Sequence, residues 1–192
     1  MRTIHALFDD RSAARQAVYD LEAMGIPSDD ISIVSHGEED SDAAAGAGIG
    51  AGLGAAVGGA GGLLAGLGIM AIPGVGPVVA AGWLASTLAG AAGGAIVGGA
   101  AGGLIGALTD SGVSEDEAHF YAEGVRRGGH LVTARVTDEQ YAAADSVLTR
   151  ANRVDVAERR RLYEESGWER FDPDLPPYTA EEIERERQIY RS

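Results

Sequence analysis

Histidine, acidic and serine side chains are the groups in this chain that could do chemistry. The four histidines lie far apart, without the short spacing of a metal site, and are His5, His36, His119 and His130. Acidic pairs such as Glu38 and Glu39 lie in charged runs, and the serines lack the turn that presents a hydrolase nucleophile. We therefore predict a non-enzymatic protein with no catalytic, metal-binding or cofactor-binding residue.

The composition excludes further classes of site. Cysteine and lysine are absent, which removes disulfide frameworks, thiolate ligands, Schiff-base lysines and the lysine of a phosphate-binding loop. No Gly-x-Gly is followed by the third glycine of a dinucleotide fingerprint, so no cofactor or small-molecule substrate is evident. A net charge of −14 without an adequate basic patch argues against nucleic acid as a partner.

The longest feature of the sequence is an uncharged segment, residues 43–109, which begins after an acidic run and ends at Asp110. It is longer than the ~40 residues that two membrane crossings require. Its middle carries two prolines and two glycines that favour a tight reversal, at Pro73, Gly74, Gly76 and Pro77. The segment therefore predicts a two-helix transmembrane hairpin, with membrane lipids as its partner.

Glycine recurs at every fourth residue on both arms of this predicted hairpin. The positions are Gly46, Gly50, Gly54, Gly58, Gly62 and Gly66, then Gly82, Ser86, Gly90, Gly94, Gly98, Gly102 and Gly106. This spacing places small residues along one ridge of a helix, where two backbones can approach closely in lipid. We expect these residues to pack helices within the chain and between copies, giving a homo-oligomer.

Two other interpretations of this segment are a disordered alanine-glycine linker and a hairpin buried in a soluble core. The regular glycine spacing argues against the linker, and the small size of the remaining chain argues against the buried hairpin. The depth of the predicted hairpin stays open. Either its turn reaches the far interface, with Trp83 near the boundary, or the hairpin dips into the membrane and returns.

The flanking sequence contains two strand-helix-strand units, residues 3–35 and 130–156. They predict an α+β ferredoxin-like split βαβ domain interrupted by the hairpin. Asp9 or Asp10 caps the first helix and Asp138 the second, and Ser114 with Glu117 forms a capping box for a helix to Arg126. The predicted divisions are 1–42, 43–109, 110–157 and a helical C-terminal tail, 158–192.

The tail begins with three arginines, Arg159, Arg160 and Arg161, which could contact lipid phosphates or form a solvated helix face. An extended segment with aromatic residues follows, between Gly167 and Tyr178. Such segments dock on their own domain or on a neighbouring subunit. A final charged helix completes the tail.

Several short motifs together resemble one bacterial family. They are Phe8-Asp9-Asp10-Arg11-Ser12-Ala13, Gly25-Ile26-Pro27 with Ile31-Ser32-Ile33-Val34, the glycine ladder, and Gly112-Val113-Ser114-Glu115-Asp116-Glu117-Ala118 through Gly128-Gly129. In this order they resemble the general stress proteins, or heat-induced stress proteins, over about residues 2–157. The resemblance implies ferredoxin-like halves around a glycine-zipper hairpin in a stress-linked envelope protein, and it offers no catalytic residues.

The sequence thus favours a membrane-anchored, self-associating scaffold protein linked to the stress response. We expect it in the cytoplasmic membrane with its folded part facing the cytoplasm, because the first residues contain no export signal. An oligomeric pore and a membrane-tethered module that senses a small ligand are the alternatives.

Overall fold

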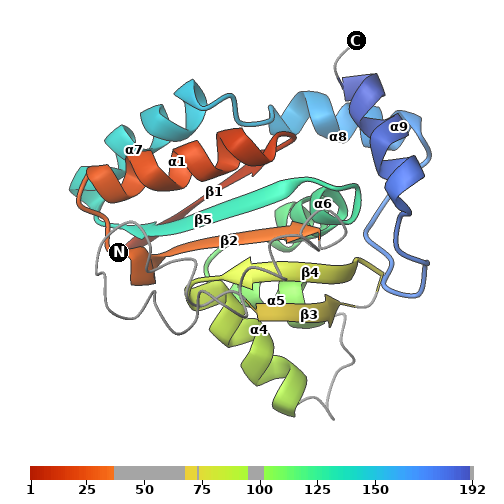
Figure 1. Cartoon of the computed structure of the whole chain (residues 1–192), viewed down its shortest axis with the longest axis horizontal. Coiled ribbons are helices and arrows are strands. Elements are labelled where there is room, and N and C mark those ends of the chain that lie inside the picture. The colour runs from red at the N-terminus through yellow and green to blue at the C-terminus, as the bar shows by residue number, and fades with distance from the viewer. Residues whose placement is uncertain (37–67, 73, 95–101, 191–192) are drawn as a thin grey trace, which may run out of the picture.

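A computed structural model describes residues 1–36, 68–72, 74–94 and 102–190. In chain order the elements are β1 (Arg2–Phe8), α1 (Arg11–Ala23), the 3₁₀ helix η1 (Ser28–Asp30), β2 (Ile31–His36), β3 (Gly68–Ile72), β4 (Gly76–Ala81), α4 (Trp83–Gly94), α5 (Gly102–Asp110), α6 (Glu115–Arg126), β5 (His130–Val136), α7 (Asp138–Arg150), α8 (Val156–Glu165) and α9 (Ala180–Tyr190). The strands form one sheet in the order β1-β5-β2-β4-β3, with all neighbours antiparallel. The protein has the α+β fold that the sequence predicts (Figure 1).

The first predicted strand-helix-strand unit is confirmed as β1, α1 and β2. Asp10, and not Asp9, caps α1, because its carboxylate accepts a hydrogen bond from the Ala13 amide at 3.0 Å. Gly25 ends the helix with a φ of +85°, a conformation that glycine adopts without strain. Strand β5 lies between β1 and β2, so the order of these three strands is compatible with a ferredoxin-like arrangement.

The second unit is confirmed only in its strand and helix. Thr137 caps α7 through a capping box with Gln140, so Asp138 is the first helical residue and not the cap. The predicted strand over residues 153–156 is wrong. Its Val154 amide donates to the Leu7 carbonyl of β1 at 2.8 Å, but Asp155 then caps α8 and the chain turns into that helix.

Residues 68–72 and 78–81 were expected to be helical and instead lie in strands β3 and β4. The predicted reversal is confirmed as a turn, in which the Val75 amide donates to the Ile72 carbonyl at 3.0 Å, but it connects two strands. Strand β4 then pairs with β2 from Ile33 to His36. Valine and isoleucine favour strands, and pairing of β4 with the edge of β2 satisfies its backbone hydrogen-bonding groups. These tertiary contacts outweigh the helix that the glycine spacing predicted.

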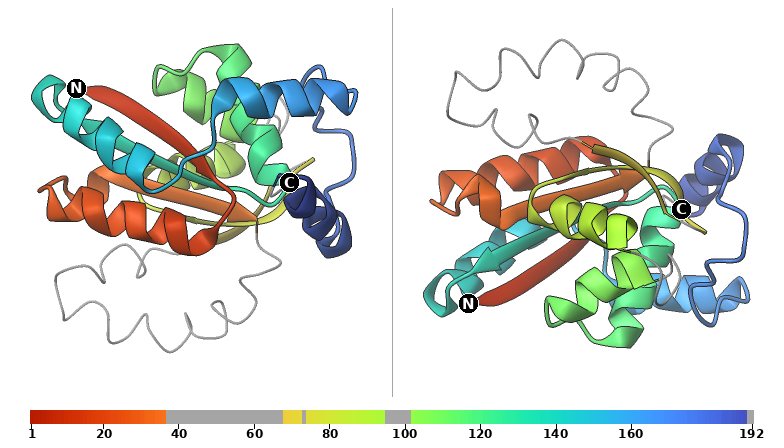
Figure 2. Two further views of the ribbon diagram at one scale, coloured as in Figure 1. Left: turned by 90° about the horizontal axis from the view of Figure 1, so that it is seen from above. Right: turned by 90° about the horizontal axis from the view of Figure 1, so that it is seen from below.

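The helices cover both faces of the sheet. Helices α1 and α7 lie on one face and α4, α5 and α6 on the other, while α8 and α9 lie beyond one end (Figures 1 and 2). Leu84, Leu88, Leu104 and Leu108 of α4 and α5 are buried in a core shared with Phe120 of α6. The rest of the chain therefore covers this part of the uncharged segment, contrary to the expectation that it is too small to do so.

None of the helices in the described ranges combines the length and the apolar character that a membrane crossing requires. The glycines of the first predicted arm, from Gly46 to Gly66, and also Pro73 and Gly98, lie outside the described residues.

Candidate functional site

The C-terminal tail docks on its own domain, which is one of the two expected outcomes. Its extended part passes directly over the β3–β4 turn. A Cβ atom added to Gly74 would lie 2.7 Å from the Cα of Pro173, and one added to Gly76 would lie 2.8 Å from the Cβ of Pro177. Both glycines also have positive φ angles. The turn therefore needs glycine at these positions to admit the tail.

A buried charged cluster fastens the tail to α6. Glu123 is fully buried and accepts hydrogen bonds from Arg127 at 2.7 Å and from Arg126 at 3.3 Å. Arg127 also donates to Glu186 of α9 at 2.9 Å, and Arg126 donates to the Pro176 carbonyl at 3.0 Å. Buried charges persist only when they are paired and hydrogen-bonded, so the tail completes the cluster.

Aromatic rings surround the Arg127 guanidinium, which lies 4.3 Å from the ring centroid of Tyr163 and 5.5 Å from that of Tyr178. Burial opposes its charge, but the hydrogen bond and charge of Glu123, together with Glu186, raise the pKa of Arg127 overall. Burial also raises the pKa of Tyr163 to about 12. Arg127 therefore stays charged and Tyr163 neutral around neutral pH, which suits a structural role.

A second ion pair connects α8 to the end of β1. Both guanidinium nitrogens of Arg159 contact the Asp9 carboxylate, at 2.7 and 2.6 Å, and the guanidinium lies 3.5 Å from the ring centroid of Tyr190. Arg159, one of the three arginines predicted to contact lipid phosphates or to form a solvated helix face, is buried and paired with Asp9. Arg160 lies over the rings of Phe120 and Trp168, and the exposed Arg161 lies 3.9 Å from Glu165.

No group of three potential metal ligands occurs in the described ranges. His130 and Ser35 are buried on neighbouring strands with Nδ1 and Oγ 2.8 Å apart, which resembles a serine–base pair. His5 faces Tyr121 with ring centroids 5.9 Å apart, and burial lowers the pKa of His5 to about 4. Burial, followed by the charge of Arg170, lowers the pKa of His119.

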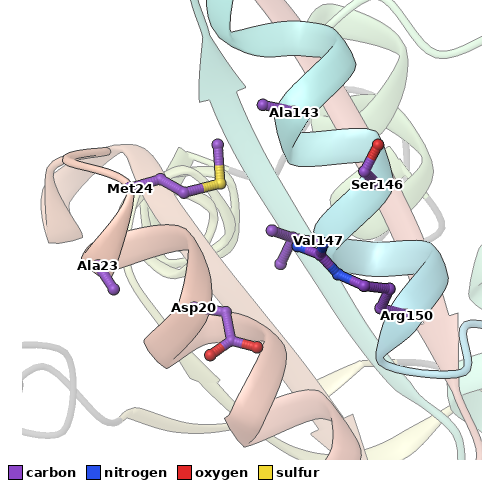
Figure 3. Close-up of a pocket in the computed structure, with 7 residues that line it drawn as sticks. All are labelled: Asp20, Ala23, Met24, Ala143, Ser146, Val147 and Arg150. Atoms are coloured by element: carbon purple, nitrogen blue, oxygen red, sulfur yellow. The ribbon is translucent and has the colours of Figure 1, made fainter.

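An open groove runs between α1 and α7, with a volume of about 720 Å³ (Figure 3). Its lining residues are Asp20, Ala23, Met24, Ala143, Ser146, Val147 and Arg150. Most of its lining residues are exposed, namely Ala23, Ala143, Ser146 and Arg150. It does not enclose a small molecule as ligand sites commonly do, so it gives little support to a ligand-sensing function.

The predicted helix-packing positions that the structure describes divide into three groups. Gly82 precedes α4 and lies against β2, where an added Cβ would be 2.0 Å from the Ile31 carbonyl oxygen. Ser86 is exposed, and a Cβ on Gly106 would meet nothing within 4 Å. Gly90, Gly94 and Gly102 lie in helices α4 and α5. The assignment of these positions to helix packing stays a prediction.

The cluster of Glu123, Arg126 and Arg127 was not predicted from the sequence. Its signal was present, because these residues follow one another at i, i+3 and i+4 on a single predicted helix. Their partner Glu186 lies too far along the chain to be found by spacing. The geometry of the cluster indicates that it holds the tail on the domain.

Comparison of the chain with protein-family models, curated proteins and solved structures found no match.

Proposed function

We propose that this protein is a non-enzymatic scaffold that attaches to the cytoplasmic membrane and self-associates, in the manner that its resemblance to general stress proteins implies. The folded domain is the rigid unit. The uncharged residues 43–67, with glycine at every fourth position, supply the contact with lipid. Residues 68–109, first assigned to the same contact, are excluded from this role wherever they pack in the folded core.

The observation that supports this proposal is the placement of the two strands that flank residues 37–67. Ala80 pairs with Val34 on one side and with Gly68 on the other, so β2 and β3 are two strand spacings apart in one sheet. From these spacings the end of β2 and the start of β3 are about 12 Å apart. The intervening chain must therefore leave and return on the same side of any membrane.

Chain length then selects between the two hairpin depths that the sequence left open. Two complete crossings require ~40 apolar residues, and the uncharged stretch 43–67 is shorter than that. The proposal is therefore a segment that dips into one leaflet and returns. An insertion of this kind anchors the domain without exposing any part of it on the far side.

Flotation of the full chain with lipid vesicles tests this proposal. Leu63→Asp combined with Leu64→Asp places two charges in the proposed insertion, each costing about 2.5–3.5 kcal/mol at full depth and less near the interface. We expect this variant to stay at the bottom of the gradient while the natural chain floats. Tyr19→Asp with Leu175→Asp, two exposed apolar residues of the folded part, is the matched control and should float normally.

A natural chain that fails to float with vesicles of either neutral or anionic lipid would contradict membrane attachment. Equal flotation of the two double variants would show that residues 43–67 are not the contact.

A further inference from the structure

Strand β1 is an edge of the sheet, and it pairs with β5 alone among the described strands. The Leu7 carbonyl accepts from Val154, which lies outside the β1–β5 ladder, so Leu7 directs its backbone groups away from β5. Backbone direction alternates along a strand. Thr3 and His5 therefore also direct their N–H and C=O groups to this outer side, where the described part of the chain supplies no backbone partner.

This edge lacks the usual protection against pairing with another strand. Natural edges are commonly blocked by proline, by a bulge, or by charged side chains. Strand β1 contains no proline, its register with β5 is continuous from Arg2 to Phe8, and Arg2 is its only charged residue. The Arg2 guanidinium lies 3.7 Å from the ring centroid of Tyr141, so it is held against α7.

We propose that β1 of a second copy of this chain pairs with this edge in antiparallel orientation, and that this is the self-association surface of the proposed scaffold. The two-fold axis passes beside Thr3. Thr3 then faces the partner's Thr3, and the outward groups of both chains form hydrogen bonds. The two five-stranded sheets become one continuous sheet.

The structure selects this register over the next two along the strand. A two-fold axis beside Ile4 would place Met1 opposite the partner's Leu7, and one beside His5 would place Thr3 there, but the Leu7 carbonyl already accepts from Val154. An axis beside Thr3 confines the overlap to residues 1–5 and avoids Val154. It also places Arg2 opposite the partner's Ile4, so the two arginines are not opposed.

The shared surface is small, because one short strand from each chain contributes the backbone contacts. Stable dimers in solution commonly bury ~1,200 Å² or more, so we expect weak pairing in dilute solution. Confinement to a membrane raises the effective concentration and favours the pair. The expected strength of this pairing therefore rests on the proposed membrane attachment, whereas the strand register does not depend on it.

Cysteine crosslinking of the vesicle-bound full chain tests the register, because the natural chain has no cysteine. In the proposed pair the Cα atoms of the two Thr3 residues are about 5.5 Å apart, within the range of a disulfide. The two His5 residues are more than about 13 Å apart. Thr3→Cys should form a disulfide dimer under mild oxidation, and His5→Cys, on the same face of the same strand, should not.

Thr3→Pro provides a second measurement. It removes an outward N–H without removing a bond of the β1–β5 ladder, so the fold should persist. In a Gln188→Cys background labelled with donor and acceptor dyes, energy transfer on vesicles should fall to the level of unpaired chains. Gln188 is an exposed residue of α9.

Equal disulfide yield from Thr3→Cys and His5→Cys, or unchanged energy transfer in Thr3→Pro, would overturn the pairing. Flotation of each variant is measured in parallel. Chains that float but do not crosslink disprove the interface and leave membrane attachment intact. If chains do not float, the proposed function fails, and crosslinking at high concentration in solution then decides the register alone.

Discussion

Arg159 holds both carboxylate oxygens of Asp9, at 2.7 and 2.6 Å, and so connects the first helix of the tail region to the end of the first strand. Arg159 is buried whereas the Asp9 side chain keeps 38% of its surface exposed. Bidentate pairs of this kind fix geometry as well as charge. Because Tyr190 stacks on the same guanidinium, the pair also positions the end of α9.

Replacing Arg159 with alanine should lower the free energy of unfolding by about 1–3 kcal/mol, below the value for fully buried pairs because Asp9 is partly hydrated. Urea denaturation monitored by tryptophan fluorescence measures the change. Asp9→Asn should act in the same direction with a smaller effect. If the double variant Asp9→Asn, Arg159→Ala shows the full sum of the two losses, the residues do not interact as described.

Gly128→Ala should release α9 from the domain. An added Cβ would lie 2.3 Å from Cγ2 of Ile183, and Gly128 has a φ of +87°. Gly112→Ala is the matched control, because Gly112 has a φ of +97° with nothing within 4 Å. Limited proteolysis should cleave residues 167–190 faster in Gly128→Ala only, while both variants lose about 1 kcal/mol to backbone strain.

Ile183→Ala should restore part of the protection in the Gly128→Ala background, since it removes the atoms that clash. Cleavage at the same rate in Gly112→Ala and Gly128→Ala would show that Ile183 does not occupy this position.

Gly82→Ala distinguishes the observed β4–α4 junction from a continuous glycine-zipper helix. The added Cβ would lie 2.0 Å from the Ile31 carbonyl oxygen and 2.9 Å from the Ser32 Cα, and backbone atoms cannot move aside cheaply. We expect a loss of about 3 kcal/mol or more, read as a lower Tm. Gly106→Ala, in α5 with open space around it, should be neutral or stabilising by up to about 1 kcal/mol. Similar small effects at both positions would favour the zipper helix.

Stability should fall as the pH is lowered from 6.5 to 4, because the pKa of His5 is lowered to about 4 by burial. The unfolded chain then binds a proton that the folded chain does not, so the free energy of unfolding rises with pH in this window. The loss by pH 4 is about 2 kcal/mol, since the ring keeps some contact with water. Denaturation of His5→Asn should show a flatter dependence. The burial-lowered pKa of His119 and the pKa values of Asp10, Glu139 and Glu182, which hydrogen bonds lower, contribute to the remainder.

Titration by NMR supplies the direct measurement. A His5 ring that titrates near pH 6.5 in the folded protein would contradict this expectation.

Local signals were sufficient for the elements whose stabilising contacts are close in sequence. Asp10 and Ser114 cap α1 and α6, and Gly25 ends α1, each through bonds within a few residues. Local alternation of apolar residues marks β1, β2 and β5, so these elements were predicted. The strand expected at residues 153–156 failed because Asp155 can cap a helix as readily as end a strand. Whether the chain forms a helix or a strand here depends on packing against distant residues, which the spacing of residues in the sequence does not reveal.

The sequence by itself determined the α+β class, the Ser114 cap, the position of the reversal near Gly74 and the uncharged character of residues 43–109. Only the tertiary structure decided that part of this segment pairs with β2 and packs in the core, and that Glu186 and Asp9 meet arginines of distant segments. An apolar run has the same sequence pattern whether lipid or the edge of a sheet covers it. A single charged residue likewise does not reveal which distant residue pairs with it. The choice is made by free energies of contacts between residues far apart in the chain.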